Sequence, residues 1–152
     1  MGEAAAAAAK ATPATQARDA GRGAGRRLPD LSALPRDQLG VVMIRHFLDR
    51  WEGDETLMAL LRASVTNEAA AERMRQLFAG QLGPAIAKLS GNGPDTATRA
   101  GLIATQALGL ALCRYVLALP PVAALSRAAV IAWLAPTLQH YLTSAAPADS
   151  PL

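Results

Sequence analysis

Cysteine is nearly absent from this 152-residue chain, in which Cys113 is the only one. A single cysteine cannot close an internal disulfide or build a four-cysteine zinc site, which excludes a small disulfide-stapled secreted module. Aromatic residues are also scarce, at 4% of the chain, whereas alanine occurs 35 times. Because alanine is the best helix former and strands favour β-branched and aromatic side chains, we expect an all-α fold without strands.

Large apolar side chains are missing from residues 2–27. The net charge of the chain is +3, and residues 1–36 carry all of this excess, since acidic and basic residues balance over 37–152. A segment that cannot bury apolar surface does not offset its ordering entropy, so we expect residues 1–28 to form a disordered tail. The basic stretch 21–27 leaves open a contact with nucleic acid through charge alone, whereas the rest of the chain is neutral.

Apolar residues after Pro35 recur at three- and four-residue steps, which is the period of an amphipathic helix. We expect Gly83-Pro84 to kink or break the third of these helices, Pro120-Pro121 to end the fourth and Pro136 to bend the fifth. The expected helices are Pro35 to Gly53, a short one capped by Asp54, one capped by Thr66 or Asn67, residues 95–119, and one capped by Ser126. Residues 144–152 are expected to form a loose tail.

The fourth expected helix contains an uncharged stretch, residues 100–113, whose 14 residues resemble part of a membrane span. A span needs roughly 20 residues, so we expect no membrane insertion. The same helix carries a ridge of small side chains at four-residue steps: Ala97, Gly101, Thr105, Gly109 and Cys113. Because small residues let another helix approach closely, both packing within the chain and a subunit interface remain open.

Groups suited to catalysis are few. His46 and His140 lie far apart in the sequence, and His46 with Asp49 makes only half of a metal site, without a third ligand. Cys113 lies in an apolar stretch, where a free cysteine behaves as a small hydrophobe. We therefore expect no enzyme, no bound metal and no cofactor.

A more specific pattern consists of short motifs spread over roughly three quarters of the chain. The motifs include Pro35-Arg-Asp-Gln-Leu-Gly40, Arg45-His-Phe-Leu48, Leu82-Gly-Pro84, Arg114-Tyr-Val-Leu117 and the most specific one, Leu134-Ala-Pro-Thr-Leu-Gln-His-Tyr-Leu142. Through them, residues 29–143 resemble the C-terminal domain of the tetracycline-repressor (TetR) family of bacterial transcription regulators. The resemblance implies a helical domain that binds a small, usually apolar effector between its helices and dimerises through its last two helices.

The resemblance also implies which residues bind the effector and which form the dimer interface. The residues expected to line the effector cavity are Phe47, Trp51, Leu61, Met74, Phe78 and Gln106, for which plain core packing is the alternative. Among them Gln106 is the best polar anchor, because a buried amide needs a hydrogen-bond partner. The residues expected at a homodimer interface are Gly101, Thr105, Gly109, Leu112, Ile131, Leu134, Leu138 and Tyr141.

The DNA-reading domain of the family would precede Pro29, where this sequence has its alanine-rich tail. No residue is therefore assigned to DNA reading, and we expect contact with DNA only through a missing N-terminal domain or an intact paralogue. We predict a cytoplasmic effector-binding and dimerisation domain of a TetR-like regulator. The alternative is a helical protein–protein interaction module, a headless heterodimer partner, with no small-molecule pocket.

Overall fold

The fold is all-α over the part of the chain that the computed structural model describes, residues 27–148, in which no strand occurs. This confirms the fold class expected from composition. The elements are the 3₁₀ turns η1 (Leu31–Ala33) and η2 (Arg36–Gln38), the helices α2 (Leu39–Gly53), α3 (Glu55–Ser64), α4 (Glu68–Ser90) and α5 (Thr96–Ala111), the π-turn η3 (Leu112–Val116), and the helices α6 (Pro120–Ala123) and α7 (Arg127–Thr143).

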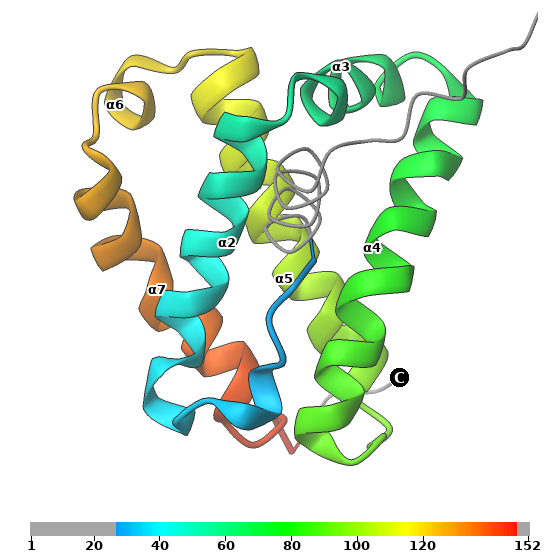
Figure 1. Ribbon diagram of the computed structural model, residues 1–152, viewed down its shortest axis with the longest axis vertical. Coiled ribbons are helices and arrows are strands. Elements are labelled where there is room, and N and C mark those ends of the chain that lie inside the picture. Colours follow the sequence, from blue (N-terminus) through cyan, green and yellow to red (C-terminus); the bar gives the residue numbers. More distant parts are fainter. Residues whose placement is uncertain (1–26, 149–152) are drawn as a thin grey trace, which may run out of the picture.

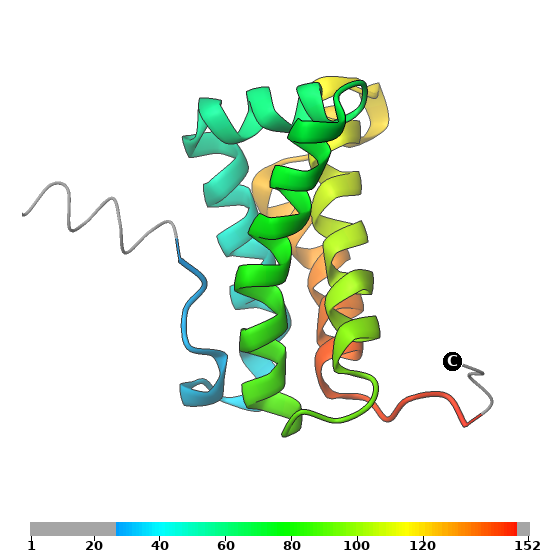
Figure 2. The same cartoon turned by 90° about the vertical axis from the view of Figure 1, so that its right-hand side faces the viewer.

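The long helices α2, α4, α5 and α7 run roughly side by side, and α3 crosses one end of the bundle from α2 to α4 (Figures 1 and 2). The most extensive contact joins α2 to α7, and α4 packs against both α3 and α5. Residues 27–33 lie along the bundle between α2 and α4 (Figure 1). The core between the helices is made mostly of aliphatic side chains, including Leu39, Ile44, Leu48, Ile103 and Leu138.

Three helix starts agree with the caps expected from the sequence. The side chain of Asp54 accepts from Leu57 N at 3.0 Å, that of Asn67 from Ala70 N at 2.9 Å, and that of Ser126 from Ala129 N at 3.1 Å. Each bond satisfies one of the N–H groups that a first helical turn leaves without a partner. These starts are therefore decided locally, by a side chain and an amide three residues later.

Several expected helix boundaries are wrong. The first helix begins at Leu39, after two 3₁₀ turns, and not at Pro35. Of the kink or break expected at Gly83-Pro84, the break does not occur, because α4 continues from Glu68 to Ser90 with Pro84 inside it. Proline removes one backbone donor, and packing of α4 on both neighbouring helices offsets that cost.

The fourth helix also ends earlier than expected. Regular α-helix stops at Ala111, and a π-turn leads to Ala118, whose φ of 48° is left-handed. The amide of Leu119 then donates to the carbonyl of Cys113 at 2.9 Å, which closes the turn. Pro120-Pro121 starts the short α6, which suits proline because a first turn needs no N–H there.

Most of the expected N-terminal tail, residues 1–26, lies outside the described residues, as do residues 149–152 of the expected C-terminal tail. Leu28, the last residue of the expected tail, is half-buried and packs against the core. At the other end, the carbonyl of Ser144 accepts a hydrogen bond from Arg99 at 2.7 Å. The described contacts therefore include residues just before 29 and just after 143.

None of the described helices combines the length and the apolar character needed to cross a membrane.

Candidate functional site

A partly enclosed cavity lies between α2, α3 and α4, beside the start of the described chain. Its volume is about 40 Å³, well below the roughly 300–1,000 Å³ of a drug-sized ligand site. The wall is mostly apolar and aromatic. It consists of Leu28, His46, Phe47, Arg50, Trp51, Leu57, Leu77, Phe78, Gln81 and Leu82.

Two helices contribute to this cavity with the same spacing. Helix α2 supplies residues at 46, 47, 50 and 51, and α4 supplies residues at 77, 78, 81 and 82. Positions i, i+1, i+4 and i+5 form one continuous strip of a helix surface. The cavity is therefore the space between two facing strips, with Leu57 of α3 and Leu28 at its edges.

Trp51 is the most unusual residue of the cavity wall. Only 4% of the residue is exposed, and its indole Nε1 is buried without a hydrogen-bond partner among the described residues. A buried donor that lacks an acceptor costs about 1–3 kcal/mol. Trp51 also borders a second, more open and polar cleft with Glu52, Met58 and Tyr115.

The charged and titratable groups at the cavity are balanced. Arg50 pairs with Asp54 at 3.0 Å, and both side chains are more than four-fifths buried. Burial lowers the pKa of His46 from its ordinary value, the positive charge of Arg50 lowers it further, and Asp49 opposes the shift. The neutral form of the imidazole therefore predominates at pH 7, and Asp54 balances the charge of the lining residue Arg50.

Three of the six expected ligand-binding residues, Phe47, Trp51 and Phe78, line this cavity. Leu61 and Met74 are buried in the core without reaching it. Gln106 is half-buried on α5 and also lies outside the lining, so the structure does not bring the expected polar anchor to the cavity.

The polar residues of the cavity wall were not among the residues expected to bind the effector. His46 and Arg50 immediately precede Phe47 and Trp51, and Gln81 follows Phe78 by three residues. The spacing along the helix could have indicated these residues. A residue four or five positions from an expected lining residue shares its helix face.

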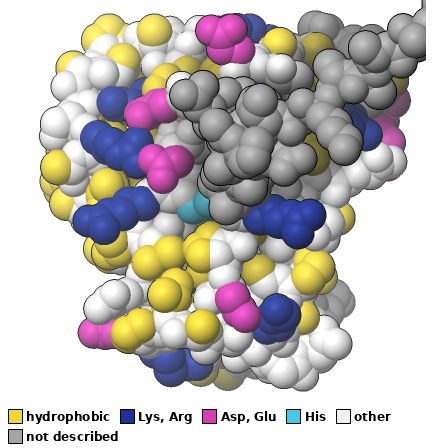
Figure 3. All heavy atoms as spheres, in the orientation of Figure 1, with side chains coloured by type: hydrophobic (Ala, Val, Ile, Leu, Met, Phe, Trp, Pro, Cys, Tyr) yellow, Lys and Arg dark blue, Asp and Glu magenta, His cyan; other side chains and the backbone are white. Residues whose placement is uncertain are grey.

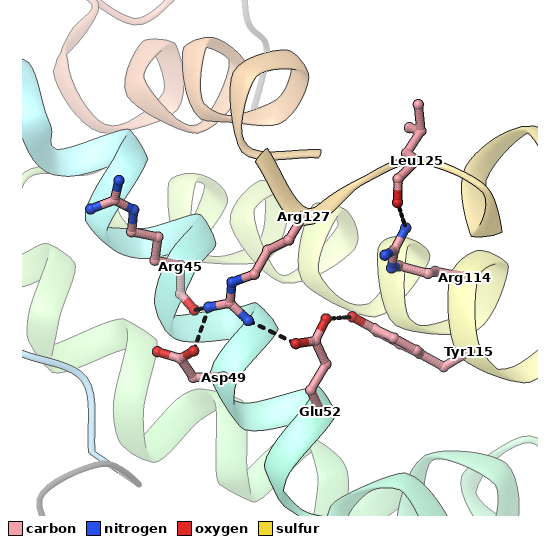
Figure 4. A network of polar contacts seen from close by, with 7 residues as sticks. All are labelled: Arg45, Asp49, Glu52, Arg114, Tyr115, Leu125 and Arg127. Carbon is pink, nitrogen blue, oxygen red and sulfur yellow. Dashed lines mark hydrogen bonds and ion pairs between the residues drawn. The ribbon is translucent and has the colours of Figure 1, made fainter. Parts of the chain in front are cut away.

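A network of polar contacts fastens α7 and the π-turn to α2 on another side of the molecule (Figure 4). Arg127 donates to Glu52 at 2.7 Å and also bonds Asp49, while the Tyr115 hydroxyl donates to the second oxygen of Glu52 at 2.7 Å. Burial, followed by the neighbouring Glu52 carboxylate, raises the pKa of Tyr115 to about 12. Arg114 bonds the carbonyls of Val122 and Leu125 at 2.8 and 2.9 Å, which holds α6 in place.

The ridge of small residues on α5 is open in the described part of the chain. A Cβ built on Gly101 or on Gly109 would meet nothing within 4 Å, apart from the adjoining residues and the helix's own backbone. Gly101 and Thr105 are exposed, and Gly109 is half-buried. Packing within the subunit therefore does not cover the ridge at these two glycines.

The residues expected on α7 divide between surface and core. Ile131, Leu134 and Tyr141 are half-buried, as is Leu112 of the π-turn. Leu138 is fully buried within its own chain, so it belongs to the core and has no exposed surface for a partner. Trp133, which is 76% exposed, was not among the expected interface residues, because it lies between Ile131 and Leu134 and outside the apolar stripe that they share.

Basic and acidic side chains are interspersed on the face seen in Figure 3, with apolar side chains between them. Within residues 27–148, no group of three or more His, Cys, Asp or Glu side chains is placed to hold a metal ion.

Comparison with known proteins gives one match. The family model described as "Tetracyclin repressor-like, C-terminal domain" matches residues 37–142. No curated protein and no solved structure matches the chain.

Proposed function

Because the chain belongs to the tetracyclin repressor-like C-terminal domain family, we propose that residues 29–143 act as the effector-binding and dimerisation domain of a cytoplasmic bacterial transcription regulator. The family supports a regulatory domain in general. The observation that carries effector binding in particular is the aromatic cavity between α2 and α4, which is lined in part by Trp51, a residue whose buried indole donor has no partner among the described residues. Three residues expected from sequence to bind the effector line that cavity.

Regulation would follow from two arrangements of the helices with different affinities for the effector. The cavity volume of about 40 Å³ means that binding requires α2 and α4 to separate or their side chains to turn. An effector therefore favours a wider arrangement of these helices. Leu28 lies at the edge of the cavity, so such a change reaches the N-terminal end of the domain.

Effector binding is tested by thermal unfolding in the presence of a broad library of small apolar compounds. At least one compound is expected to raise the melting temperature, because a ligand that binds only the folded state stabilises it. Leu57→Trp should fill the cavity and abolish this shift. Leu60→Trp is the matched control, since Leu60 is also half-buried on α3 but does not line the cavity. A library without effect on the wild type would reject effector binding.

Dimerisation is supported by the open ridge on α5 and by Trp133, the most exposed large apolar side chain described. A second copy of this chain would place its own α5 against the ridge, where the small residues allow close approach. Light scattering should give about 32 kDa, twice the 15.8 kDa of one chain. A monomer at micromolar concentration would reject the homodimer.

The alternative function, an interaction module without a small-molecule pocket, is favoured by one observation, the small size of the cavity. The two proposals differ in the library experiment. A protein that dimerises, and that no compound stabilises, fits the interaction module alone.

A further inference from the structure

The donor of Trp51 limits what the cavity can bind favourably. Its Nε1–H has lost contact with water and has gained no acceptor among the described residues. An acceptor atom on a ligand would recover the energy of that missing hydrogen bond, whereas a pure hydrocarbon would leave the donor unsatisfied. The rest of the indole ring, with Phe47 and Phe78, offers apolar surface to the remainder of the ligand.

The charged groups around the cavity further limit the charge that a ligand can carry. The two titratable lining residues are Arg50 and His46, and the carboxylates near them are Asp49 on α2 and Asp54 between α2 and α3. Arg50 is bonded to Asp54, and Asp49 is bonded to Arg127. An anionic ligand would have to compete with Asp54 for Arg50 and would lose its own hydration, which is costly in a mostly apolar wall. A neutral ligand avoids both costs.

The volume limits the ligand to a small molecule. About 40 Å³ accommodates only the smallest occupants without movement, and Nε1 itself lies below the surface that solvent reaches. The neighbouring side chains must therefore shift for an acceptor to reach the indole. A compound with one ring requires the smallest shift that still fills the space between Phe47, Trp51 and Phe78.

We propose that the cavity selects a small, uncharged, apolar compound with one hydrogen-bond acceptor, such as a single-ring ketone, and that Trp51 Nε1–H is the donor that recognises the acceptor. The inference rests on the effector-binding part of the proposed function and specifies its ligand class. It makes Trp51 a specificity-determining residue, because the acceptor distinguishes a ketone from a hydrocarbon of the same shape.

The test uses three compounds of matched shape with the full chain. Acetophenone carries a neutral acceptor, α-methylstyrene has a CH₂ group in place of that oxygen, and benzoate carries a negative charge. Indole N–H resonances of the protein are followed by ¹H–¹⁵N NMR, and Trp133→Phe assigns the two tryptophans. Acetophenone should move the Trp51 indole proton downfield. It should also bind about tenfold more tightly than either other compound, which corresponds to about 1.4 kcal/mol for satisfying the buried donor.

Trp51→Phe tests whether the indole donor recognises the ligand, because this substitution removes the N–H and keeps an aromatic side chain in the cavity wall. The preference for acetophenone over α-methylstyrene should disappear in this variant, whereas it should persist in Trp133→Phe, whose altered residue is 76% exposed in the wild type. If Trp51→Phe does not fold, the downfield shift in the wild type still decides the question.

The outcomes separate this inference from the proposed function. Equal binding of α-methylstyrene, or tighter binding of benzoate, would overturn recognition by Trp51 and leave the cavity as an effector site. If none of the three compounds perturbs the Trp51 resonance, the ligand class is wrong, and the wider library then decides whether any effector binds.

Discussion

The backbone N–H of Gly40 donates a hydrogen bond to Gln139 Oε1 at 2.7 Å, where α2 meets α7. The amide nitrogen of the same Gln139 side chain donates to the carbonyl of Arg36 at 2.5 Å. One glutamine thus satisfies a first-turn donor of α2 and also binds the turn before it. The contact needs glycine, because a Cβ on residue 40 would lie 2.2 Å from the carbonyl oxygen of Ala135.

Gly40→Ala should destabilise the protein by about 2 kcal/mol, since the new methyl group collides with backbone that cannot turn away. Gly80→Ala is the matched control on α4, where a Cβ meets nothing within 4 Å. The control should gain about 0.5–1 kcal/mol from the better helix propensity of alanine. Urea denaturation measures both, and a Gly40→Ala variant as stable as the control would contradict the close crossing of α2 and α7.

Ala118→Gly should stabilise the protein by about 0.5–1 kcal/mol. Ala118 has φ of 48°, a conformation that is unfavourable for alanine and costs nothing for glycine. Part of this gain is lost because glycine makes the unfolded chain more flexible. The control Ala79→Gly, at an exposed position inside α4, should lose about 1 kcal/mol. Loss of stability in both variants would show that residue 118 is not left-handed.

Gly101→Leu should weaken the proposed homodimer without harming the fold of one subunit. A Cβ at Gly101 meets nothing within 4 Å in the chain, but a leucine there would hold a second α5 away from the ridge. Gly80→Leu, equally open on α4, controls for the added bulk and helix propensity. Light scattering over a dilution series should show the monomer for Gly101→Leu at concentrations where Gly80→Leu remains dimeric. The interface lies elsewhere if the two variants dimerise equally.

Acid should destabilise the fold partly through His46. Because its pKa is lowered in the folded state from the usual 6.5, the unfolded chain binds the proton more readily, and stability falls as the pH drops below about 6.5. His46→Gln removes this contribution and should flatten the decline between about pH 7 and pH 5. Denaturation midpoints across that range measure the difference. An unchanged slope in the variant would mean that His46 is not buried as neutral imidazole.

Much of the local structure could be predicted from the sequence. The caps at Asp54, Asn67 and Ser126 depend on a side chain and an amide three residues away, and the all-α fold follows from abundant alanine and scarce aromatics. The family resemblance also pointed to Phe47, Trp51 and Phe78 as lining residues, and all three border the cavity between α2 and α4.

Features that depend on distant parts of the chain were decided only by the tertiary structure. The face that α4 turns toward α2 brings Gln81 to the cavity, whereas the position of α5 leaves Gln106 outside it. No local sequence pattern determines either placement. The continuation of α4 through Pro84 depends on the helices packed against it. The ridge on α5 is visible in the sequence as a repeat of small residues. Whether the ridge is open at Gly101 and Gly109 depends on where the other helices pack, so only the tertiary structure shows it.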